Sequence, residues 1–176
     1  MNPQDTTTTD PPTMVIGLGN PILGDDGVGW RVIDEVERRL AAMPNPPPVI
    51  LDRLAVGGFT LMERLSGAGR AILVDSVVTP GSIPGGVRVD PLEALASRPA
   101  AHLDSGHDAP LASALAAGRA LGARLPGEVL AVTIEVAPCD TFSERLSPLV
   151  AEAVPPAADA VMEVLIDSLA LAETWR

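Results

Sequence analysis

Two acidic residues and one histidine are the side chains of this chain best suited to chemistry. Asp26 follows an apolar run and a short glycine-rich loop, Asp75 closes the apolar run 72–75, and His107 precedes an apolar, helix-like segment. Two carboxylates and one imidazole from three separate loops would make an open three-ligand site. Such a site suits a borderline divalent ion and leaves one position for water or substrate.

Each of these residues also has an ordinary structural explanation. An acid before a helix, such as Asp25 or Asp26, often only complements the helix macrodipole. An acid at the end of a buried strand, such as Asp75, is often simply where the chain meets water. A loop histidine is usually a surface residue, which is the explanation we favour for His102. The case for Asp26, Asp75 and His107 therefore depends on whether the fold brings them together.

Two other kinds of site fit the sequence poorly. The segment Gly17-Leu-Gly19 begins like a dinucleotide-binding motif, but its third glycine would fall at Ile22, and the chain has no lysine for a phosphate-binding loop. Cys139 lies beside Asp140, and a neighbouring carboxylate raises a thiol pKa rather than lowering it. We therefore expect no nucleotide site and no catalytic cysteine.

Strands alternate with helices along the chain, which predicts the fold class. Apolar runs and helical periodicity predict these elements: strands over Met14–Leu18, Val49–Leu54, Arg70–Val77, Val87–Val89 and Glu128–Val136, and helices over Gly27–Leu40, Thr60–Leu65, Leu92–Leu95, Ala109–Leu121 and from Pro148 to about Ala172. The order predicts an α/β three-layer sandwich, with a mostly parallel five-stranded sheet and helices on both faces. We expect Pro155-Pro156 to break or restart the last helix.

This order also suggests how the polar residues meet. In open α/β folds ligands bind at the carboxyl edge of the sheet. The loop that carries Asp26 leaves the first strand at that edge. We expect the strands over Met14–Leu18 and Arg70–Val77 to be neighbours in the sheet, so that Asp26 and Asp75 meet there.

Composition limits the class of protein. With 176 residues the chain suits one domain, which we place at 14–176, after a polar and disordered tail over 1–13 that should be dispensable for stability. A net charge of −11 argues against nucleic acid as a partner. A single cysteine allows no internal disulfide, and no stretch looks like a signal peptide or a membrane span, so we expect a cytoplasmic protein without membrane insertion.

Several motifs in sequence order resemble one known family. The strongest is Gly17-Leu-Gly-Asn20 followed by Asp25-Asp26-Gly27-Val-Gly29, and weaker matches are Leu51-Asp52 with Gly57-Gly58, Ile72-Leu-Val-Asp75, Ser105-Gly-His107, and Ile134-Glu-Val-Ala-Pro138 with Leu146-Ser-Pro148. Together they resemble the nickel–iron hydrogenase maturation proteases over about Met14 to Leu171. These endopeptidases remove a short C-terminal extension from the hydrogenase large-subunit precursor.

The resemblance implies a function and a set of residues. The family's metal-binding trio falls on Asp26, Asp75 and His107, which would be both catalytic and metal-binding, and we assign substrate binding to Asn20, Gly57 and Gly58 within the matching motifs. The partner would be the precursor, and the metal would be nickel already inserted in it, with other divalent metals as substitutes.

The resemblance also leaves choices open. A metal held by the trio can polarise the scissile carbonyl or activate a water, while a nearby carboxylate takes a proton. Whether Asp26 or Asp75 is the base stays open. The alternatives are a related metal-dependent hydrolase that acts on another peptide, and a non-catalytic chaperone that checks the metal during hydrogenase assembly.

Overall fold

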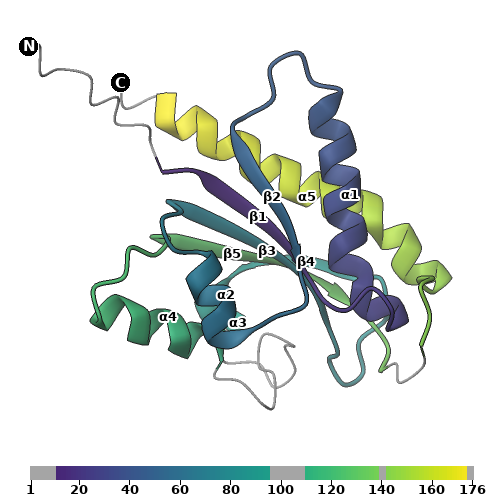
Figure 1. Ribbon diagram of the computed structural model, residues 1–176. Coiled ribbons are helices and arrows are strands. Elements are labelled where there is room, and N and C mark those ends of the chain that lie inside the picture. Colours follow the sequence, from purple (N-terminus) through teal and green to yellow (C-terminus); the bar gives the residue numbers. More distant parts are fainter. Residues whose placement is uncertain (1–10, 96–109, 139–141, 174–176) are drawn as a thin grey trace, which may run out of the picture.

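Five strands form one sheet between two layers of helices (Figure 1). The structure is a computed structural model of the chain and describes residues 11–95, 110–138 and 142–173, with side chains as far as 166. The strands are β1 (Thr13–Leu18), β2 (Val49–Leu54), β3 (Arg70–Val77), β4 (Val87–Pro91) and β5 (Glu128–Glu135). The helices are η1 (Gly24–Gly27, a 3-10 turn), α1 (Val28–Ala41), α2 (Gly58–Arg64), α3 (Leu92–Leu95), α4 (Leu111–Ala120) and α5 (Pro148–Glu173).

The sheet has the order β2-β1-β3-β5-β4. Its first four strands are parallel, and β4 runs antiparallel along β5 at the edge. From β1 the chain passes to β2, which lies on one side of β1 in the sheet. The later strands β3, β5 and β4 all lie on the other side of β1. The carboxyl ends of β1 and β3 therefore flank the point where the strand order reverses, which is where open α/β sheets bind ligands. The predicted neighbourhood of these two strands is confirmed.

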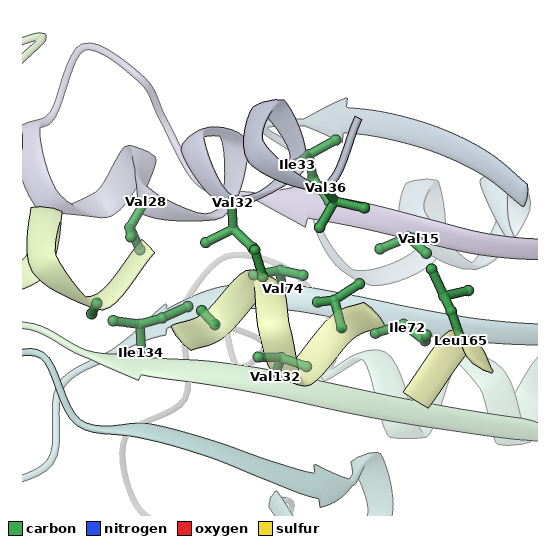
Figure 2. Packing of buried hydrophobic residues seen from close by; sticks show 14 of the residues in the cluster. Val15, Val28, Val32, Ile33, Val36, Ile72, Val74, Val132, Ile134 and Leu165 are labelled. Carbon is green, nitrogen blue, oxygen red and sulfur yellow. The ribbon is translucent and has the colours of Figure 1, made fainter. Parts of the chain in front are cut away.

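Each face of the sheet is covered by its own hydrophobic cluster. Successive side chains of a strand point to opposite faces. Ile72 and Val74 of β3 accordingly join the cluster under α1 and α5, whereas Ala71 and Leu73 join the cluster under α2, α3 and α4. Figure 2 shows the first cluster, in which Val32 of α1 lies against the strand residues. The predicted three-layer α/β architecture is thus confirmed.

The last helix departs from the prediction. We expected Pro155-Pro156 to interrupt it, but α5 is continuous through both residues. The prolines remove the donors that the carbonyls of Ala151 and Glu152 would receive, yet all four residues are exposed, so water can satisfy those carbonyls. The opposite side of α5 stays buried in the first cluster before and after the two prolines. This burial holds the helix in place.

The start of the domain also differs by one residue. Thr13, which we predicted to belong to the tail, is the first residue of β1 and pairs with Val49 and Arg70. The preceding Pro12 accepts a hydrogen bond at its carbonyl from the Gly69 N–H, at 3.0 Å. Among the described residues, no helix combines the length and apolar character needed to cross a bilayer.

Candidate active site

Asp26 lies in η1, at the carboxyl edge beyond β1, and its carboxylate is held from two sides. Its Oδ2 accepts the backbone N–H of Asn20 at 2.6 Å, and its Oδ1 accepts the hydroxyl of Ser76 at 3.1 Å. The first donor comes from the loop after β1 and the second from β3. The side chain is half-buried. Asp26 is therefore anchored to both strands that flank the reversal point of the sheet.

Asp75 is the buried member of the pair. Its side chain lies on the face of β3 that Leu73 shares, and only 2% of the residue is exposed. Burial first, and then the negative charge of Asp26, raise the pKa of Asp75 to about 8, against the opposing effect of the Ser76 N–H, which donates to Asp75 Oδ1 at 2.8 Å. Asp75 therefore holds its proton at neutral pH beside a charged neighbour.

Two glycines let the Asp26 loop come this close to the sheet. Gly19 has a φ of +117°, and a Cβ built there would lie 1.9 Å from the Asp26 carbonyl oxygen. A Cβ on Gly29 would lie 2.4 Å from the Leu18 carbonyl oxygen and 2.5 Å from that of Val74. Any side chain at either position would push η1 and the start of α1 away from the ends of β1 and β3.

Asp25 has a different role from its neighbour. It is buried, and its Oδ1 accepts the N–H of Ser147 at 2.6 Å, just before α5 begins. From the sequence, the ordinary explanation for Asp25 was a charge that complements the dipole of the helix directly after it. Its hydrogen bond to Ser147 is instead made near the start of α5. Ser143 adds to the connection by pairing with Leu23 in a short parallel bridge. The Asp26 loop is thus tied to the segment that leads into α5.

The site can hold and move a proton. Two adjacent carboxyl groups, one of which keeps its proton at neutral pH, are an arrangement suited to general acid–base chemistry. A cation brought between them would favour release of the Asp75 proton, because metal ligands bind in their deprotonated form. Among the described residues no three His, Cys, Asp or Glu side chains form a metal-binding group.

A sequence model of the family described as HycI, hydrogenase maturation protease, matches residues 12–164. The chain belongs to the hydrogenase maturation protease family. The resemblance seen in the motifs is therefore confirmed, and so is the expectation that the protein is a peptidase.

Relatives of this maturation protease agree with the assignment. The hydrogenase expression/formation protein HupD of Bradyrhizobium diazoefficiens is 26% identical over 162 residues, which are 92% of this chain and 82% of the relative. The HupD of Thiocapsa roseopersicina is 27% identical over 160 residues, covering 89% and 69% of the two chains.

Solved structures of maturation proteases share the fold. The hydrogenase maturating endopeptidase HybD from E. coli superposes with a TM-score of 0.70 at 23% identity, covering 89% of this chain and 93% of its own. The hydrogenase 2 maturation peptidase from a Thaumarchaeota archaeon has a TM-score of 0.56 at 29% identity, with coverages of 88% and 97%. The α/β architecture of this protease is thus the one found in the family.

One predicted site residue of the protease, His107, lies outside the described residues, together with His102 and Cys139, which we predicted to take no part in the site. His107 falls in 96–109, as does His102, and Cys139 falls in 139–141. The helix that follows His107 is described, and α4 packs on the face that Asp75 shares. Because α4 leads into the first residue of β5, it runs antiparallel to the sheet, so its start at Leu111 lies toward the carboxyl edge.

The residues predicted to bind substrate lie in loops of the same edge. Asn20 is engaged within its own loop, where its N–H binds Asp26 and its Oδ1 accepts the Ile22 N–H at 3.2 Å. Gly57 precedes α2, and its carbonyl accepts the Leu61 N–H at 3.2 Å. Gly58 opens α2 with a φ of 52°. Their assignment to substrate binding stays a prediction.

Ser76 and Glu135 were not predicted from the sequence. Ser76 contacts both carboxyl groups of the site. Glu135, at the end of β5, accepts hydroxyl hydrogen bonds from Thr79 at 2.9 Å and from Ser82 at 2.7 Å, which fix the connection between β3 and β4. The only available signal for Ser76 was its place directly after Asp75, and a polar residue at a strand end is too common to single out.

Proposed function

We propose that this protease removes the C-terminal extension of a nickel-loaded nickel–iron hydrogenase large-subunit precursor. The observation that carries the proposal is that Asp26, held by Ser76, and buried Asp75, whose pKa the charge of Asp26 raises, lie together at the reversal point between β1 and β3. The family is one of hydrogenase maturation proteases, and the HupD relatives are named for hydrogenase expression or formation. Both support a hydrogenase subunit as the substrate.

In this proposal Asp26, Asp75 and His107 meet the nickel that the substrate carries. Nickel accepts imidazole nitrogen and carboxylate oxygen, which is the donor set of the three residues. The fixed carboxylate of Asp26 would orient the substrate. Asp75, which holds a proton at neutral pH, would ionise on contact with the substrate and could then accept a proton from the attacking water. The metal ion of the substrate would supply polarisation of the scissile carbonyl.

The proposal is tested by cleavage of a purified precursor loaded with nickel or left without it. We expect release of the C-terminal peptide from the loaded precursor only. Mass spectrometry of the intact subunit measures this release. Equal cleavage of both forms would remove nickel as the recognition element. Binding of the loaded precursor without cleavage would favour the chaperone alternative, and cleavage of unrelated peptides would favour a different hydrolase.

A further inference from the structure

We infer that Ser76 is a positioning residue whose side chain sets the orientation of the Asp26 carboxylate beside Asp75. The inference rests on the proposed function for its effect on cleavage, but its structural part stands on contacts within the protein. The Ser76 hydroxyl donates to Asp26 Oδ1 at 3.1 Å, and its backbone N–H donates to Asp75 Oδ1 at 2.8 Å. One residue thus connects the two acids across the edge of the sheet.

Strand geometry explains how one residue can reach both acids. Successive side chains of β3 point to opposite faces, so Asp75 shares the face of Leu73 and Ser76 shares the face of Val74, which α1 covers. The pairing of β1 with β3 ends at Gly17 and Val74. Ser76 therefore lies beyond the end of β1, in the place that η1 crosses as the chain passes to α1.

The environment of Ser76 makes its hydroxyl specific for Asp26. The residue is fully buried, with 0% exposed, so water does not compete for its hydroxyl. A buried hydroxyl needs a partner, and the Asp26 carboxylate supplies one with a charge, which makes the hydrogen bond stronger than one between neutral groups. The contact spans 50 residues of sequence, so it joins two separate elements.

Two of the hydrogen bonds that hold Asp26 act on different oxygens of its carboxylate. The Asn20 N–H donates to Oδ2 and restrains that oxygen. The Ser76 hydroxyl at Oδ1 fixes the second oxygen and with it the plane of the group. Groups that bind a metal or a reacting atom must be held to within about 0.5 Å, which takes such supporting contacts.

The test compares Ser76→Ala, Ser76→Cys and Ser76→Thr with the wild type. Alanine removes the hydroxyl, cysteine keeps the volume with a weak donor, and threonine keeps the hydroxyl. We expect kcat/KM for the nickel-loaded precursor to fall about tenfold in the alanine and cysteine variants and to stay within about threefold in the threonine variant. A matched control is Ser82→Ala. It removes the serine hydroxyl that donates a hydrogen bond to Glu135, and it should leave kcat/KM unchanged.

A second measurement needs no substrate and separates this inference from the proposed function. The side-chain carboxyl ¹³C resonance of Asp26 should shift in Ser76→Ala and Ser76→Cys and stay in place in Ser82→Ala. If the resonance does not move, or if Ser76→Cys keeps full kcat/KM, the positioning role is wrong. Failure of the wild type to cleave the precursor would contradict the proposed function, while the resonance would still decide the role of Ser76.

Discussion

The surroundings of Asp75 keep this single residue protonated at neutral pH. Its pKa of about 8 in the folded protein compares with about 4 in an unfolded chain. Between these values the folded state binds more protons than the unfolded state. The contribution of Asp75 to stability is therefore full below about pH 4 and is lost as the pH rises through about 8.

This pH dependence gives the first prediction. Asp75→Asn introduces a side chain of similar shape that does not titrate. Between pH 5 and 8 the free energy of unfolding of this variant should decline less than that of the wild type, by an amount on the order of a few kcal/mol. Urea unfolding of both proteins at several pH values, without metal ions, measures the difference. Parallel pH profiles would show that Asp75 does not carry a raised pKa.

The two histidines should differ in their effect on cleavage. Of these, His107 is predicted to act with Asp26 and Asp75, whereas His102 is predicted to be a surface residue. We expect His107→Ala to reduce precursor cleavage by about 100-fold or more and His102→Ala to change it less than about twofold. Initial cleavage rates measure both, with thermal unfolding to confirm that each variant folds. Equal effects of the two variants would contradict the assignment.

At the scale of elements, the start of α1 must press against two strand ends to bring Asp26 into place. Gly29→Ala puts a methyl group 2.4 Å and 2.5 Å from the backbone oxygens of Leu18 and Val74. We expect a loss of about 2 kcal/mol or more in unfolding free energy, with reduced cleavage. Gly127→Ala is the matched control because a Cβ there meets nothing within 4 Å, and it should be close to neutral.

The first strand gives a second prediction at this scale. The sequence alone predicted that residues 1–13 are dispensable for stability, but a chain that begins at Met14 lacks Thr13 and the Pro12 carbonyl that accepts the Gly69 N–H. Compared with a chain that begins at Pro11, it should lose about 1 kcal/mol, or about 2–4 °C in melting temperature. Calorimetry of the two truncations measures the difference. Identical melting temperatures would mean that these contacts add nothing to the strand.

The pattern of apolar residues explains why most elements could be predicted. Runs such as Ile72-Leu-Val74, which are buried on both faces, are typical of the interior strands of a covered parallel sheet. Connection rules for parallel strands then bring Asp26 and Asp75 to one edge without any knowledge of coordinates. The fold and the meeting of the two acids were therefore accessible from the sequence.

The features that could not be predicted from the sequence depend on contacts between distant segments of the chain. Asp25 binds Ser147, which lies 122 residues away, and nothing in either local sequence indicates the other. The continuity of α5 through Pro155-Pro156 depends on burial of its opposite side, which local proline chemistry does not include. Ser76 likewise becomes meaningful only once η1 lies over the end of β3.

At the scale of the whole molecule, the charge of the protein suits a protein substrate better than a nucleic acid. The net charge is −11 and all twelve basic residues are arginine. Several of these arginines form surface ion pairs with acids of neighbouring elements, such as Arg53 with Asp34 and Glu37. These arginines are thus engaged within the fold.

Asp26 and Asp75 are proposed to act together on a nickel-loaded precursor. The most direct measurement is the rate of C-terminal peptide release for the wild type, Asp26→Asn, Asp75→Asn and the double variant, with Asp159→Asn as an exposed-acid control. We predict that each single variant loses about 100-fold or more, that the double variant is little worse than either, and that the control matches the wild type. Wild-type rates in both single variants, or losses that multiply in the double variant, would contradict the account.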